Sequence, residues 1–215
     1  MVCTFLTLPD TAQQALNALL QEIRSCSVCA AHLSHAPRPV LRASAAARLL
    51  IVGQAPGRRV HETGIPWNDP SGDLLRQWLQ LTREQFYDVS RIAIAPAGFC
   101  YPGTVRGGDL PPRRECAPLW HPRLIPLMPQ LRLVLLVGRY AQAYYLGTGK
   151  ERVAETVQAY AEHVQQGYFP LPHPSPRNRL WLKRNAWLEL EVLPALRARV
   201  GALLADVQAA PIRAR

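Results

Sequence analysis

The chain has 215 residues, of which 48% are hydrophobic and 19% are charged. This composition excludes a disordered chain, and the length suits one well-buried unit, so we predict a single domain over residues 1–215. The 25 Lys and Arg residues outnumber the 15 Asp and Glu residues, which gives a formal net charge of +10. That charge favours an anionic partner, nucleic acid first, although an arginine-rich proteome alone can produce it.

The sequence also limits where the protein is expected. No run of about 18 apolar residues is free of charge, so we expect no membrane span. The first ten residues, MVCTFLTLPD, lack the basic start and the cleavage site of a secretion signal. We therefore expect a cytoplasmic protein, in which structural disulfides are uncommon and cysteines have other roles.

Helices and strands alternate along the chain. Helix signals cover residues 8–26, 71–81, 115–128 with prolines inside, the segment after residue 140, 153–165, and 179–204 with a break near Pro194. Short apolar runs typical of buried strands cover residues 47–53, 91–98, 131–138 and 167–172. The order predicts an α/β fold with three layers, α/β/α, around a central, mostly parallel four-stranded sheet.

In sheets of this kind, ligands bind beyond the carboxyl ends of the strands. Four segments are expected there: residues 53–67, residues 97–102, the neighbours of Gly138, and residues 171–176. A site is therefore predicted where these segments meet.

Four of the five cysteines form two close pairs. Cys26 and Cys29 are separated by two residues at the end of the first helix, and Cys100 and Cys116 by fifteen. Four thiolates suit an iron–sulfur cluster or a tetrahedral zinc ion, and four small buried cysteines are the simpler alternative. Cys3 is left over and is not expected to be a ligand.

Sequence motifs join these cysteines in a fixed order. The first is Gly-Gln-Ala-Pro-Gly (53–57), followed by Thr-Gly-Ile-Pro-Trp (63–67) and Gly-Asp-Leu-Leu (72–75), and the last is His-Pro-Ser (173–175). With the cysteine spacing, the motifs resemble the iron–sulfur uracil-DNA glycosylases of the family 4 type. The likeness runs from Cys26 into the C-terminal helix. It implies a [4Fe-4S] cluster rather than zinc, DNA as the partner and a chain that acts as a monomer.

The resemblance also implies a reaction and a set of site residues. Such an enzyme would cleave the N-glycosidic bond of a flipped deaminated base, uracil or a related one. His173 stands where the family stabilises the departing base anion, and Trp67 stands where it stacks a Phe on the base. A structural histidine and a core tryptophan are the alternatives. Gln54 and Asp69 complete the expected catalytic set, and the other expected base contacts are Gly53, Ala55, Pro56, Gly57 and Asn68.

A basic segment follows the last motif. Ser175 is expected to hold DNA phosphates together with Arg177 and Arg179, and Leu180 to enter the duplex as a wedge. A solvated basic start to a helix is the alternative. More arginines for the DNA backbone lie between the third and fourth cysteines, namely Arg106, Arg113 and Arg114.

The chain departs from the family pattern at three positions. Gln54 replaces a Glu, and Ala55 fills the place where the classical enzymes of the superfamily carry an Asp, so the motif has lost its acids. Asp69, Glu62 and His61 are the candidate substitutes. Pro96 stands where the family has an Asn that binds the uracil edge, and proline offers neither a side-chain amide nor an N–H.

These departures leave two further hypotheses open. The first is a catalytically weak or inactive DNA-binding protein of the same fold, which the missing acids and Pro96 favour and the retained His173 opposes. The second is a metal-stabilised domain that acts on a small nucleoside or nucleotide. Strongly salt-dependent DNA binding would oppose the second hypothesis, because phosphate contacts release counterions.

Overall fold

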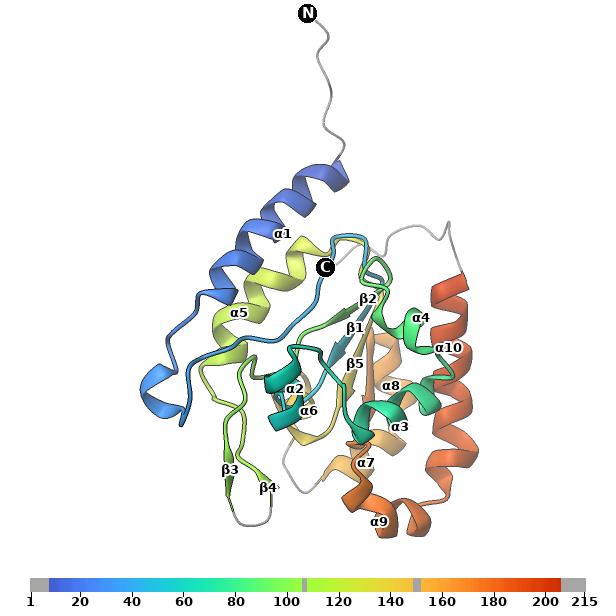
Figure 1. The fold of residues 1–215 in the computed structure, drawn as a ribbon. Helices are drawn as coiled ribbons and strands as arrows, with labels where there is room; N and C mark the ends of the chain where they lie inside the picture. Colours follow the sequence, from blue (N-terminus) through green and yellow to red (C-terminus); the bar gives the residue numbers. More distant parts are fainter. Residues whose placement is uncertain (1–7, 106–107, 149–151, 206–215) are drawn as a thin grey trace, which may run out of the picture.

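The computed structural model describes residues 8–105, 108–148 and 152–205 (Figure 1). Its strands are β1 (Leu49–Val52), β2 (Ile92–Ile94), β3 (Thr104–Val105), β4 (Gly108–Asp109), β5 (Leu133–Val137) and β6 (Tyr168–Leu171). Its α-helices are α1 (Leu8–Arg24), α2 (Arg58–Thr63), α3 (Pro70–Leu79), α4 (Arg83–Tyr87), α5 (Cys116–Leu124), α6 (Arg139–Leu146), α7 (Val153–Gln158), α8 (Tyr160–Gln165), α9 (Arg179–Arg184) and α10 (Leu193–Ala205). Shorter helical turns are Ala30–His32, Ile125–Leu127, Pro176–Asn178 and Leu188–Val192.

A four-stranded parallel sheet forms the centre of the molecule. Its strand order is β2-β1-β5-β6, and every neighbouring pair is parallel. Leu50 of β1 pairs with Ala93 on one side and with Val134 on the other. The predicted α/β fold with a central, mostly parallel sheet is therefore confirmed.

Helices cover both faces of this sheet, because side chains of a strand point alternately to opposite faces. Leu49 and Ile51 belong to the core shared with α3 and α10. Leu50 and Val52 belong to the core shared with α1 and α5. Figure 1 shows α1 and α5 on one side of the sheet and α3 and α10 on the other, so the arrangement is the predicted three layers.

The structure corrects several predicted boundaries. Residues 58–63, expected in a loop, form α2, which ends at Gly64 with a left-handed φ of 69°. The single helix expected over 153–165 is divided into α7 and α8 at Ala159. The C-terminal break lies at Asn185, whose side-chain amide donates to the Trp181 carbonyl at 2.7 Å. Pro194 causes no break, because it stands in the first turn of α10, where a proline is tolerated.

A short hairpin lies in the segment between Cys100 and Cys116, where the sequence indicates only a loop. Thr104 pairs with Asp109 and Val105 with Gly108 in an antiparallel ladder. The hairpin stands apart from the main sheet, on the side where the central strands end (Figure 1). Within the described residues, no helix is long and apolar enough to cross a membrane.

Candidate active site

A narrow pocket of about 50 Å³ opens at the carboxyl edge of the sheet, as the strand order predicts. We call it the inner pocket. It brings together the end of β1 with its glycine-rich turn, the end of β2, the loop before α3 and the segment after β6. The lining residues used below are Gly53, Gln54, Ala55, Pro56, Gly57, Trp67, Asp69, Pro96 and His173.

Trp67 forms one wall of the inner pocket, and two glycines make room for it. A Cβ on Gly53 would lie 2.8 Å from the indole, and one on Gly72 would lie 1.8 Å from the Trp67 carbonyl oxygen. Trp67 itself has a φ of 55°, which is rare for a residue with a bulky side chain. Such a conformation persists only where its surroundings enforce it, so the indole is held in place rather than free to turn.

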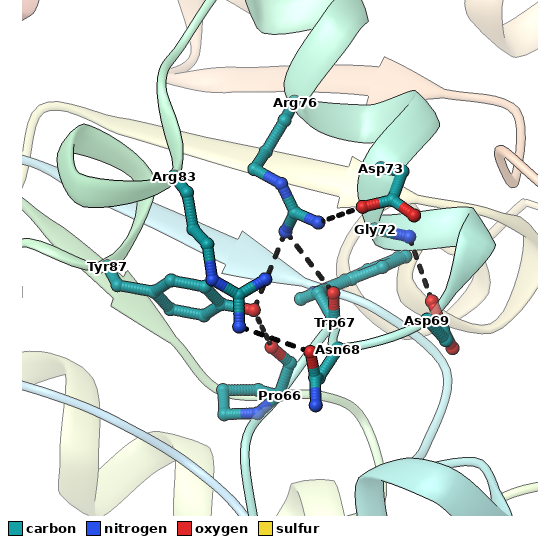
Figure 2. A network of polar contacts seen from close by, with 9 residues as sticks. All are labelled: Pro66, Trp67, Asn68, Asp69, Gly72, Asp73, Arg76, Arg83 and Tyr87. Carbon is teal, nitrogen blue, oxygen red and sulfur yellow. Dashed lines mark hydrogen bonds and ion pairs between the residues drawn. The ribbon is translucent and has the colours of Figure 1, made fainter.

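Figure 2 shows the polar network that holds the loop around Trp67. Arg76, which is buried on α3, donates to the Trp67 carbonyl at 3.3 Å and forms an ion pair with Asp73 at 2.6 Å. The Tyr87 hydroxyl donates to the Pro66 carbonyl at 2.8 Å. Asp69 caps α3 by accepting from the Gly72 N–H at 2.8 Å. Helices α3 and α4 thus fix the backbone that carries the aromatic wall.

His173 faces Trp67 from the segment after β6, with the two ring centroids 5.7 Å apart and the rings inclined by 31°. Gly138, with a φ of 83°, leaves space for it, because a Cβ there would stand 3.2 Å from the His173 Cβ. The Asn178 side-chain amide donates to the His173 carbonyl at 2.8 Å. The backbone around His173 is therefore fixed from both sides.

The charge state of His173 follows from its surroundings. Burial lowers the pKa of His173 below its usual value, and the nearby carboxylates of Asp69 and Asp109 oppose this effect without cancelling it. The imidazole is therefore neutral at pH 7 and carries one N–H that can donate a hydrogen bond.

A wide cleft of about 560 Å³ continues outward from the inner pocket and shares Gln54, Asp69 and His173 with it. We call it the outer cleft. Ser175 and Arg177, two of the predicted DNA contacts, line it. A deep pocket at the base of a wide cleft suits a substrate of which one part is inserted and the rest lies along the surface.

Three predicted site residues lie elsewhere in the described part of the chain. Asn68 does not line the inner pocket or the outer cleft, and its side-chain oxygen accepts from Arg83 at 3.2 Å. Arg179 and Leu180 begin α9 outside both hollows, and Leu180 is 70% exposed. Among the arginines predicted for the DNA backbone, Arg113 pairs with Glu115 at 2.7 Å. Arg106 lies outside the described residues.

The predicted base-edge position, Pro96, does lie in the inner pocket. Its carbonyl faces away toward the buried His121, whose Nε2 lies 3.0 Å from it. Gln54 reaches the mouth of the pocket, where its side-chain amide donates to the Leu110 carbonyl at 3.5 Å. Gln54 is thus the side-chain amide of this pocket that can match both donors and acceptors on a base.

The four cysteines of the predicted quartet line one cavity between α1, α5 and the loop that carries Cys100. Burial raises the pKa of Cys100 to about 11 and that of Cys116 to about 12. Within the described residues, no three His, Cys, Asp or Glu side chains are grouped as a site for a single metal ion. Four sulfur donors around a common cavity nevertheless fit a group larger than one ion. Cys3 lies outside the described residues.

Several residues of the outer cleft were missed by sequence reasoning. Asp109 reaches it from β4, Trp181 from α9 and Arg139 from the start of α6, while Asn178 both lines it and fixes His173. The sequence Gly-Gly-Asp before Leu110 is a hairpin signal that could have drawn attention to Asp109. The other three carry no local signal.

Comparison with models of protein families gives a match over residues 42–197, to the description "Uracil DNA glycosylase superfamily". The matched part begins before β1 and ends within α10, so it contains the whole sheet, His173 and every residue that lines the inner pocket except Val40. The match covers more than half of the chain. The chain therefore belongs to the uracil DNA glycosylase superfamily, and its function is of the DNA glycosylase kind.

Proposed function

We propose that this protein is a base-excision glycosylase that hydrolyses the N-glycosidic bond of a flipped deaminated base in DNA, uracil or a related base. The observation that carries the proposal is that a neutral His173 and Trp67 lie in contact at the wall of a pocket that opens into a wide cleft. A base that leaves the DNA stack needs such a pocket and an aromatic surface to lie against.

His173 would act on the leaving base. As the C1′–N bond breaks, negative charge develops on the base, and a preorganised N–H donor at that charge lowers the barrier. The His173 imidazole is neutral, and Asn178 holds the His173 backbone in place. Its N–H can therefore donate to the base from a fixed position. In this proposal Trp67 stacks on the base, and Asn68 acts on the loop through Arg83 rather than on the base.

Selection of the base would depend on Gln54 and on the backbone of residues 53–57. Pro96 occupies the pocket without a side-chain amide, so it cannot bind a pyrimidine edge as an Asn would. The Gln54 amide can present its oxygen or its nitrogen. The proposed substrate class is therefore a deaminated base with both a donor and an acceptor on its exposed edge, and uracil is one member.

The DNA itself would lie along the outer cleft. Ser175 and Arg177 line it, and Arg139 adds a third phosphate-binding side chain. Leu180 is an exposed apolar side chain two residues after Asn178, so it can enter the duplex next to the extruded nucleotide.

A cleavage panel tests the function. Single- and double-stranded DNA carrying uracil, hypoxanthine, xanthine or a mismatched thymine is offered to the protein, to His173→Ala and to His163→Ala, a control on α8. We expect one base to be released by the protein and the control, and its release to fall at least about 100-fold in His173→Ala. If DNA binds and no base is released, the chain is the catalytically inactive DNA-binding protein instead.

We also propose that Cys26, Cys29, Cys100 and Cys116 hold a [4Fe-4S] cluster, which would make the chain a divergent member of the family 4 type. Their place around one cavity supports this. When bound, the cluster would join the end of α1 to both ends of the segment that carries the hairpin. Its role would be structural.

Metal analysis separates the cluster from its alternatives. Protein purified without oxygen should contain iron and acid-labile sulfide, and Cys29→Ser and Cys116→Ser should lose both, whereas Cys3→Ser should keep them. Zinc in place of iron would contradict the cluster and leave a metal site. Absence of metal from the unchanged protein, with stability retained in both Cys29→Ser and Cys116→Ser, would indicate ordinary buried cysteines.

A further inference from the structure

Asp109 places a carboxylate at the mouth of the inner pocket, opposite the strand ends that supply the other site residues. It stands on β4 of the small hairpin and lines the outer cleft together with His173 and Ser175. One carboxylate oxygen, Oδ1, accepts from the Thr104 hydroxyl at 3.1 Å. The other, Oδ2, lies 3.4 Å from the point where a Cβ on Gly57 would stand.

This geometry orients Asp109 rather than leaving it at a random surface position. Thr104 holds one oxygen, so the second is directed over the glycine-rich turn, where Gly57 has no side chain to block it. The charge of Asp109 also opposes the burial effect on the His173 pKa, which means that the two groups are electrostatically coupled. The carboxylate thus lies beside the glycine-rich turn, at the wall of the outer cleft.

The hairpin lies close to the opposite wall of the cleft. A Cβ on Gly108 would stand 2.5 Å from Nη1 of Arg177, so the guanidinium lies directly over the hairpin backbone. At the other end, Leu110 accepts from the Gln54 amide at 3.5 Å. Asp109 lies between these two contacts, which place the hairpin next to Arg177 on one side and Gln54 on the other.

Among the described residues, the other acid that lines the outer cleft is Asp69, which also lines the inner pocket. Its Oδ1 accepts from the Gly72 N–H as the N-cap of α3, so part of its function is structural. Gln54, at the position where the superfamily motif offers an acid, cannot accept a proton from water. Each of these two acids has one oxygen engaged, but Asp109 caps no helix and directs its Oδ2 over the glycine-rich turn.

We propose that Asp109 is a catalytic residue that activates the attacking water, an inference that rests on the proposed glycosylase function. The C1′–N bond breaks and its electron pair leaves with the base, so the sugar becomes an oxocarbenium ion. Water then forms the C1′–O bond and transfers its proton to the Asp109 carboxylate. The departed base anion takes up a proton in turn, so water is consumed and the free base and an abasic site are formed.

Single-turnover release of the base named by the cleavage panel tests this role in three matched variants: Asp109→Asn, Asp69→Asn and Asp88→Asn. Asp88 is a surface acid that pairs with Arg91 and serves as the control. We expect Asp109→Asn to slow release about 100-fold, the lower end of the range for a lost general base, and Asp88→Asn to leave it unchanged. Asp109→Asn should bind DNA that carries an abasic analogue at least as tightly, because it removes a negative charge that faces phosphates.

Chemical rescue adds a result that a purely structural role would not give. Sodium formate supplies a carboxylate and should restore part of the activity of Asp109→Ala, and it should not restore His173→Ala. Release by Asp109→Asn within about threefold of the unchanged protein, or loss confined to Asp69→Asn, would overturn the proposal while the glycosylase function stands. If the unchanged protein releases no base from any DNA of the panel, both proposals fall together.

Discussion

Trp67 illustrates how single residues define the site. The indole fits because Gly53 and Gly72 have no side chains, and its strained backbone is held by Arg76. The usual cost of a left-handed conformation is of order 1–3 kcal/mol, so this loop retains it only with support from the surrounding contacts. The aromatic wall is therefore a property of at least four residues, of which the motif shows the glycines and the tryptophan.

Gly53→Ala should displace the indole, because the new Cβ would lie 2.8 Å from the ring. A misplacement of about 1 Å can lower a rate about 100-fold, and we expect a loss of that size in base release. The measurement is single-turnover kinetics, with tryptophan fluorescence as a probe of ring movement. Unchanged kinetics in Gly53→Ala would mean that Trp67 is a core aromatic with no contact to the base.

At the scale of elements, α5 is joined to the inner pocket through His121. Its Nε2 lies 3.0 Å from the Pro96 carbonyl and its Nδ1 lies 2.5 Å from the Tyr145 hydroxyl. Burial lowers the pKa of His121 to about 4. The hydrogen bond to the Pro96 carbonyl favours the charged form of His121, but burial of the ring outweighs this effect, so the imidazole is neutral at pH 7.

The pH dependence of stability follows from that shift. Above the unfolded-state pKa of about 6.5, neither state protonates His121, and its contribution is constant. As the pH falls from about 6.5 to about 4, the unfolded chain binds the proton first, and the free energy of unfolding falls by about 3 kcal/mol in total. Urea denaturation at several pH values should show this slope, and His121→Gln should be less stable near neutrality but flatter below it. An equal slope in both proteins would refute the assignment.

Helix α10 offers a substitution of the opposite sign. A Cβ on Gly201 meets nothing within 4 Å, and the residue lies inside the helix. Gly201→Ala should therefore raise the free energy of unfolding by about 1 kcal/mol through helix propensity alone. Thermal and urea denaturation measure this, and base release should not change. A destabilised variant would show that α10 packs more closely than the described residues indicate.

The elements differ in how far the sequence could predict them. The four central strands were predictable because each is a short apolar run buried on both faces, and their order placed His173 and Gly53 at one edge. The hairpin could be inferred only from its Gly-Gly-Asp sequence, because strands of two residues have no periodicity to detect. The C-terminal break was misplaced because Pro194 is a strong local signal, whereas Asn185 ends α9 through side-chain hydrogen bonds.

The same distinction applies to the site. His173 and Trp67 belong to motifs with a fixed order, so sequence alone brought them together. Asp109 and Arg139 come from segments with no motif, and their positions depend on how the hairpin and α6 pack against the sheet. Asn68 stands next to Trp67 in the sequence yet turns to Arg83, because adjacent residues of a loop need not share a direction.

For the molecule as a whole, net charge and the outer cleft predict how DNA binding responds to salt. Each phosphate neutralised by Lys or Arg adds about one to the slope of log K against log salt. Arg177→Ala should lower that slope by about one, because Arg177 lines the outer cleft. Arg91→Ala, just before β2 at the opposite edge of the sheet, should leave the slope unchanged. Equal slopes for both variants would place the DNA on another surface.

The segment from Cys100 to Cys116 also links the state of the cysteines to the position of the hairpin. Both of its ends line the cysteine cavity, and its middle carries Asp109 to the outer cleft. Oxidation of these thiols, or starvation for the iron proposed to bind them, would therefore disturb the hairpin from its base. The proposed base excision would then slow under oxidative stress, unless the cysteine site is rebuilt as quickly as it is lost.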